Sequence, residues 1–265
     1  MTNTTVDQIE TRPLSLSQPL EWLQKGWQDF MRAPIVGLAH GICVDLFGLA
    51  LLVIAHDQFW ILAGAFTGFL AVAPVVAVGL YAVSRALEKG EPAGFKVVFR
   101  TWWSWRGHPH HDWRLVKFGL LLCLSGTGWV LTSAALITLF APEPVNQPLD
   151  FIRHVVLAPD SYLFEGWLVL GGALAAPVFA STVVTLPLLM DRNIGILDAV
   201  LVSWKVVIEN PAVMGLWAAL IMVTAMLGAL ALIGSIVVIP VLGHASWHVY
   251  RDAVRAERIP PRLQE

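Results

Sequence analysis

Six apolar stretches, each about as long as a bilayer is thick, constrain this chain more than any other feature. They cover about 35–55, 60–83, 115–140, 166–190, 212–231 and 233–250. A helix that rises 1.5 Å per residue crosses the ~30 Å hydrocarbon core in about 20 residues. Because backbone groups in lipid must be satisfied within the chain, we expect each stretch to be an α-helix. The last two are divided near Gly228 to Gly234, since one helix over residues 212–250 would be about twice too long.

These stretches predict an all-α fold, a polytopic membrane helix bundle with six transmembrane helices. The composition agrees, because 57% of the 265 residues are hydrophobic and 14% are charged, whereas soluble domains carry about 25% charged residues. We assign residues 17–252 to the six-helix domain, residues 1–16 to a disordered N-terminal tail and residues 253–265 to a basic C-terminal tail. The lipid bilayer is the expected partner, and the net charge of −2 indicates no nucleic acid.

The positive charges predict the orientation of the bundle. Of the 17 Lys and Arg residues, all but Arg153 fall in segments that the six stretches place on one side of a bilayer. Positively charged loops face the cytoplasm. We therefore expect the N- and C-termini to be cytoplasmic.

The chain also contains a predicted internal repeat. Trp27 precedes Pro34 by seven residues and Trp204 precedes Pro211 by seven, and each proline opens an apolar stretch. Apolar residues at helical spacing precede both prolines, which indicates amphipathic helices in the membrane interface. The interpretation is three repeats of interfacial amphipathic helix plus helical hairpin.

One constellation of possible ligands spans three apolar stretches. The topology gives His40, Cys43, Cys123 and His244 a similar depth, and His248 lies on the same helical face as His244. Such residues are packing or interfacial polar groups in one reading. In another they bind haem or copper, with His40 and His244 as the preferred axial pair for haem, His248 as a further ligand, and Cys43 and Cys123 as metal ligands.

A second candidate is a loop with three clustered histidines, His108, His110 and His111. Clustered imidazoles suit Cu, Ni or Zn, so the loop is a candidate for metal capture. The alternative is a solvated loop without special chemistry, and three histidines in four residues match no standard zinc spacing.

Several segments resemble a known family. The stretch PVLGHASWHVYRD at 240–252, the opening at 27–34, residues 74–85 and LPLLMDR at 186–192 resemble an uncharacterised bacterial inner-membrane family, domain of unknown function 2189. Some members are labelled as similar to cytochrome c oxidase subunit I. The resemblance implies a helical protein of the bacterial inner (plasma) membrane, without an established activity.

Three functions follow as hypotheses. The chain has no phosphate loop, serine triad or paired carboxylates, which favours a non-enzymatic protein. The first hypothesis is an accessory or assembly factor that contacts other inner-membrane subunits of a respiratory or redox complex. The second is a haem- or copper-binding protein using His40, His244 and His248. The third is a transporter of a small solute, suggested by the repeat and by prolines within the spans.

Overall fold

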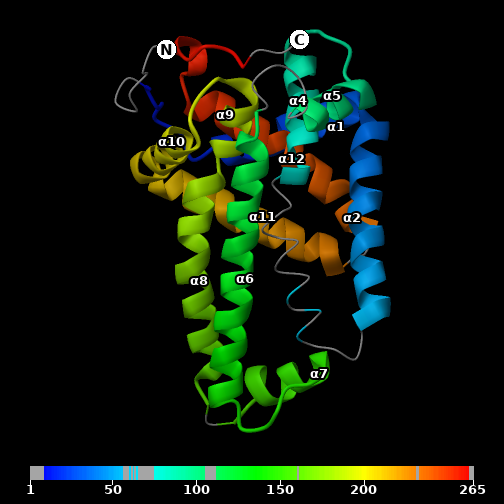
Figure 1. The fold of residues 1–265 in the computed structure, drawn as a ribbon, viewed down its shortest axis with the longest axis vertical. Coiled ribbons are helices and arrows are strands. Elements are labelled where there is room, and N and C mark those ends of the chain that lie inside the picture. Colours follow the sequence, from blue (N-terminus) through cyan, green and yellow to red (C-terminus); the bar gives the residue numbers. More distant parts are fainter. Residues whose placement is uncertain are drawn as a thin grey trace. The chain divides into compact units, whose positions relative to one another are not determined.

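The computed structural model describes residues 9–55, 60, 62, 64, 75–104, 112–159, 161–230 and 233–262. This part of the chain is helical, apart from turns and two isolated β-bridges (Figure 1). The helices are α1 (Gln18–Arg32), α2 (Pro34–Ala55), α4 (Val78–Glu88), α5 (Phe95–Trp103), α6 (Arg114–Phe140), α7 (Pro148–Phe151), α8 (Leu163–Thr182), α9 (Thr185–Asp191), α10 (Ile196–Glu209), α11 (Pro211–Leu230) and α12 (Ile233–Ala253), with a π-helical turn η3 (Ile152–Val156) and a 3-10 turn η4 (Ala256–Arg258).

Four segments among the described residues are long and apolar enough to cross a membrane. They are Pro34–Leu51 in α2, Arg114–Phe140, Leu163–Asp191 over α8 and α9, and Pro211–Gly228 in α11. Each coincides with a predicted span, the first, third, fourth and fifth. The all-helical membrane class is therefore confirmed, by the length and composition of these helices.

The predicted second and sixth spans are not among the four. Half of the second, residues 60–83, lies outside the described residues. The sixth is helical as α12, but the helix carries polar and charged side chains towards its end, including His244, His248 and Asp252. It packs against α1, α4, α9 and α11. The six-span count and the threefold repeat stay predictions.

The chain divides into two compact units. One unit contains residues 1–45, 74–118 and 179–265, and the other contains residues 46–73 and 119–178. The first unit holds α1, α4, α5, α9 to α12 and the first residues of α2. The second holds most of α6 and α8 with the connection between them.

Small residues let the helices of the first unit approach α12 closely. A Cβ atom added at Gly26 of α1 would lie 2.6 Å from the carbonyl oxygen of Val241. A Cβ added at Gly41 of α2 would overlap the backbone of Ile236. Trp22 of α1 then packs edge-on against Trp217 of α11, with ring centroids 5.6 Å apart. The Gly37-x3-Gly41 spacing thus serves helix packing, as small residues commonly do in membrane bundles.

The segments that flank the helices also pack in the first unit, in contrast to the disordered tail predicted for residues 1–16. The amide of Arg12 donates to the carbonyl of Ala253 at 2.9 Å, and the amide of Arg255 donates to the carbonyl of Glu10 at 2.9 Å. Ile9 is only 1% exposed. The polar composition of this segment does not reveal its backbone pairing with the C-terminal segment. The amide of Arg262 is likewise bonded, to the carbonyl of Asp191 at 3.0 Å.

The second unit has its own apolar cluster at one end of α6 and α8. The buried side chains of Ile137, Val145, Val155 and Leu163 form it. Trp167 packs on this cluster, and its indole N–H donates to the Ser133 hydroxyl at 2.6 Å. The connection between α6 and α8 is thus a folded element.

Candidate functional site

The buried polar centre of the first unit lies around His244 of α12, whose side chain is 0% exposed. Nδ1 of His244 lies 2.8 Å from the hydroxyl of Ser84 on α4. Helix α12 reaches this position because small residues allow it to pack closely against its neighbours. The sequence therefore buries an imidazole and supplies one partner for it from a distant helix.

Asp29 of α1 extends this polar centre. Its carboxylate lies 2.8 Å from Nε2 of His248, one helical turn beyond His244. Burial alone would raise the pKa of Asp29, but hydrogen bonds from His248 and Ser84 outweigh it, so the pKa of this carboxyl lies below its ordinary value. The carboxylate is ionised at neutral pH and can only accept hydrogen bonds.

The contact with Ser84 favours one tautomer of His244. Ser84 also contributes to the lowered pKa of Asp29, and a hydroxyl that donates its single hydrogen to that carboxylate accepts from His244. Nδ1 of the neutral imidazole then carries the proton, and Nε2 has a free lone pair.

His40 of α2 has the same tautomer for a different reason. Its Nδ1 lies 2.8 Å from the carbonyl oxygen of Val36, and a carbonyl can only accept. Nε2 of His40 therefore also bears a lone pair. It faces α4 at Gly79, where an added Cβ would lie 3.0 Å from it. The ring of Trp102 flanks the imidazole edge-on, with centroids 5.7 Å apart.

The two Nε2 atoms form the central feature of the site. Both are buried, and neither has a hydrogen-bond partner among the described residues. His40 is close enough to His244 to act on it electrostatically. A buried acceptor without a partner costs about 1–3 kcal/mol. Histidines whose second nitrogen is held by a carbonyl or hydroxyl, with a bare Nε2, have the form of metal ligands.

The remaining predicted ligands do not join this pair. His248 is engaged by Asp29. Cys43 is exposed although it lies one helical turn from the buried His40, and Cys123 is half-buried in the second unit. His108, His110 and His111 lie outside the described residues. Within the described part of the chain, no three His, Cys, Asp or Glu side chains come together as a metal cluster.

A haem does not fit at His40 as the helices are packed. An axial bond of ~2 Å would place the porphyrin plane between Nε2 and the backbone of Gly79. That gap is already closed, since the position of a single Cβ at Gly79 lies 3.0 Å from Nε2 and 2.9 Å from Val98. A single ion needs less room than a planar ring.

Sequence reasoning missed the residues that orient the two imidazoles. Ser84 and the Val36 carbonyl carry no pattern that marks them, because one is a common small residue and the other is backbone. Asp29 gave one signal, an acidic side chain between Trp27 and Phe30 near the apolar face of α1. That signal identifies a buried carboxylate but not its partners.

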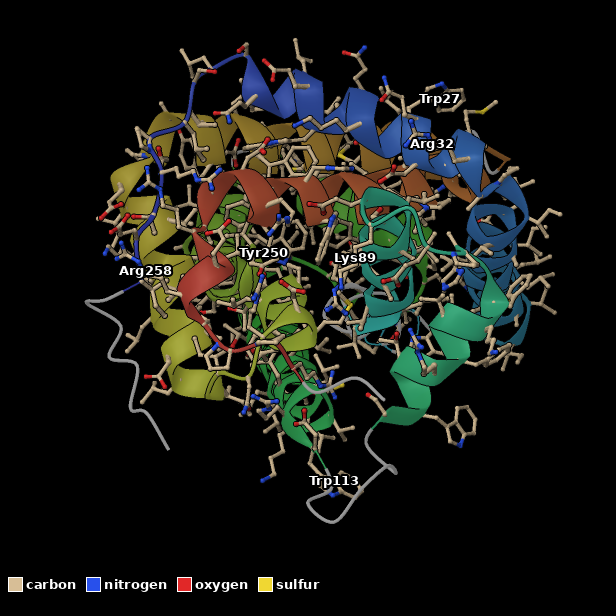
Figure 2. The ribbon with its side chains drawn as sticks, turned by 90° about the horizontal axis from the view of Figure 1, so that it is seen from above. Trp27, Arg32, Lys89, Trp113, Tyr250 and Arg258 are labelled. Atoms are coloured by element: carbon tan, nitrogen blue, oxygen red, sulfur yellow. The ribbon has the colours of Figure 1, made fainter. Side chains whose placement is uncertain are left out.

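A second buried polar group joins α4, α9 and α12 around Asp191. Its carboxylate forms an ion pair with Nε of Arg85 at 2.8 Å, and it accepts hydrogen bonds from Nε of Arg192 at 2.8 Å and from the Tyr250 hydroxyl at 2.7 Å. Figure 2 shows Tyr250 turned into the unit, whereas Trp27 and Arg32 lie at the outer margin of α1. Since its carboxylate oxygens have several donors already, Asp191 serves to hold the three helices together.

The described residues are helical and include four apolar segments long enough to span a membrane, which defines an integral membrane protein. Residues 61–191 match the family described as predicted integral membrane protein (DUF2189), so this part of the chain is similar to that family. The match covers residues 74–85 and 186–191, which confirms the resemblance seen there. Residues 27–34 and 240–252 lie outside the matched range. The comparisons with curated proteins and with solved structures give no match.

Proposed function

We propose that the protein binds a single copper(I) ion with His40 and His244, as a non-enzymatic accessory protein of the membrane. The observation that carries this proposal is the pair of buried Nε2 atoms for which the described part of the chain supplies no hydrogen-bond partner. Each imidazole is oriented by a contact at its Nδ1. Ser84 makes this contact with His244, and the carbonyl of Val36 makes it with His40. An ion between them satisfies two nitrogens that are otherwise a cost to folding.

Copper(I) is the ion that this ligand set favours. Structural zinc takes four protein ligands and catalytic zinc takes three, and no group of three is found among the described residues. Calcium and magnesium require oxygen ligands. Imidazole suits copper, and monovalent copper is stable with two neutral nitrogen ligands. A single positive charge also costs less to bury than a double charge.

Gly79 lets α4 pack closely in front of His40. A Cβ added there would lie 3.0 Å from Nε2 of His40 and 2.9 Å from the Val98 side chain. Close packing of this kind supports a site that excludes water, and such a site disfavours oxidation to the divalent ion.

The test is anaerobic titration of the purified protein in detergent with copper(I), in competition with a chromophoric chelator. The wild-type protein should bind one equivalent. X-ray absorption should show two nitrogen scatterers at about 2.0 Å. His40→Ala and His244→Ala should each abolish this stoichiometric binding. A wild-type protein that takes up no copper(I), or variants that bind it as well as the wild type, would refute the proposal.

His154→Ala is the matched control. His154 also has a buried ring nitrogen, Nδ1, without a hydrogen-bond partner in the described ranges, but it lies in the second unit and its Nε2 contacts Glu143 at 3.3 Å. The substitution His154→Ala removes one histidine from the protein and leaves the proposed ligands His40 and His244 in place. Copper binding should therefore stay at one equivalent.

The accessory role and the location form the second part of the proposal. The one-sided Lys and Arg residues support cytoplasmic termini and a bacterial inner membrane as the location. From there the bound ion would pass to other subunits of a redox complex. Purification in mild detergent should recover such subunits with the wild-type chain, and recovery of a solitary chain would count against the role.

A further inference from the structure

A partly open cavity of about 240 Å³ lies in the first unit, beside the beginning of α6. Most of its wall is apolar, and the apolar lining comes from Val75, Val76, Val78, Trp102, Leu115 and Val116. Polar side chains gather at Asp112 and Arg262, which also line it. The cavity therefore has the character of an amphiphile site, with an apolar body and a polar end.

The polar end carries excess positive charge. Asp112 accepts from Nε of Arg262 at 2.8 Å and from Nη2 of Arg114 at 2.7 Å. Two guanidinium groups thus share one carboxylate, which leaves one positive charge without a counterion among the described residues. Lys117 is exposed one helical turn after Arg114 in α6, and it adds a further positive charge.

Arg262 is the buried cation of this group. It is 8% exposed, and its Nη2 donates to the Ser104 hydroxyl at 2.9 Å. No described residue accepts a hydrogen bond from its Nη1. Burial lowers the pKa of Arg262 and outweighs the opposing effect of Asp112, which agrees with incomplete compensation of its charge.

The position of the cavity suits a membrane lipid. Arg114 and Leu115 open the apolar helix α6, so the polar end lies where a membrane span meets the headgroup region. Basic pockets beside transmembrane helices bind anionic lipid headgroups. Guanidinium groups pair well with phosphate because two N–H donors match two phosphate oxygens.

We infer that this cavity binds an anionic phospholipid, with one acyl chain against Val76, Trp102 and Leu115 and the phosphate at Arg262. The ligand is a constituent of the membrane, independent of the copper site. The net charge at the polar end selects against zwitterionic lipid, whose phosphate charge is already balanced.

The experiment is native mass spectrometry of the full chain in a neutral detergent, with phosphatidylglycerol or phosphatidylcholine of the same acyl chains. Phosphatidylglycerol should bind about tenfold or more tightly than phosphatidylcholine, because the choline group would bring a second positive charge to the guanidinium groups. Arg262→Gln should remove this preference. Arg258→Gln is the matched control, since Arg258 lies in the same segment but is exposed and pairs with Glu10.

Leu115→Trp tests the acyl-chain part without altering any charge, and Val76→Trp replaces it if the first variant is not monodisperse. Either variant should reduce binding of phosphatidylglycerol to the level of phosphatidylcholine. Equal binding of the two lipids by the wild type, or an unchanged preference in Arg262→Gln, would overturn the inference. So would inorganic phosphate that displaces the lipid completely, because the site would then be one for free anions.

Discussion

The hydroxyl of Ser84 on α4 and Nδ1 of His244 on α12 lie 2.8 Å apart in the buried centre of the first unit. This contact bears on the chemistry of His244, because a hydroxyl that donates to Asp29 must accept from the imidazole. Nε2 of His244 then keeps its lone pair, and it is buried without a hydrogen-bond partner among the described residues. A hydrogen bond between two helices thus creates one half of the proposed metal site.

Ser84→Ala should weaken copper(I) binding by about 10–100-fold without abolishing it. The imidazole loses the acceptor that fixes its orientation, and partners of this kind have effects of that size. Competition titration measures the change. Ser125→Ala is the control, because the Ser125 hydroxyl bonds only to the carbonyl of Leu121 in its own helix. Equal affinities of the two variants would show that Ser84 does not orient His244.

The helices were more predictable from the sequence than the site. The predicted spans 35–55, 115–140 and 212–231 agree within one residue with α2, α6 and α11, because an apolar run marks the helix directly. The apolar pattern also predicted α12 as a transmembrane span. The polar residues of α12 come late in the helix, so the apolar run before them looks like that of a span. The backbone pairing of residues 10 and 12 could not be predicted from the sequence, because the partners lie in the distant C-terminal segment.

Helical spacing in the sequence does not predict which side chains meet at the site. His40 and His244 were identified from their spacing and depth, and the structure buries both. The engagement of His248 by Asp29 joins residues 219 positions apart, so only the packing of α1 on α12 reveals it. The three-residue spacing also placed Cys43 on the same helix face as His40. Residues three apart still differ in direction around the helix, and Cys43 is exposed whereas His40 is buried.

Asp191→Asn should destabilise the fold strongly, by about 3–5 kcal/mol, because it leaves the buried Arg85 without its counterion. Tyr250→Phe should cost less, about 1.5–3 kcal/mol, since it removes one hydrogen bond to the same carboxylate. Thermal unfolding in detergent measures both. Glu165→Gln, which neutralises an exposed carboxylate, should leave the midpoint unchanged. An Asp191→Asn protein as stable as this control would contradict a structural role for the ion pair.

Asp112 should make stability depend on acidic pH. Burial opposes its ionisation, but hydrogen bonds and charges from Arg114 and Arg262 lower the pKa of Asp112 from 3.8 to about 2. Because the folded pKa lies below the ordinary value, the stabilisation is complete above that value and is lost as the pH falls towards 2. Asp112→Asn should therefore be less stable than the wild type at pH 6. The difference between their unfolding midpoints should shrink between pH 4 and 2, and a constant difference would contradict the assignment.

Two glycines of α2 should respond in opposite ways to the same substitution. A Cβ at Gly41 overlaps the backbone of Ile236 on α12, whereas a Cβ at Gly48 meets nothing within 4 Å. Backbone cannot rotate away as a side chain can, so Gly41→Ala should force the helices apart and cost about 1–3 kcal/mol. Gly48→Ala should leave the unfolding midpoint unchanged or raise it, because alanine favours the helix over glycine. Thermal unfolding of both variants decides the point. Equal midpoints would mean that α2 and α12 are not in close contact at Gly41.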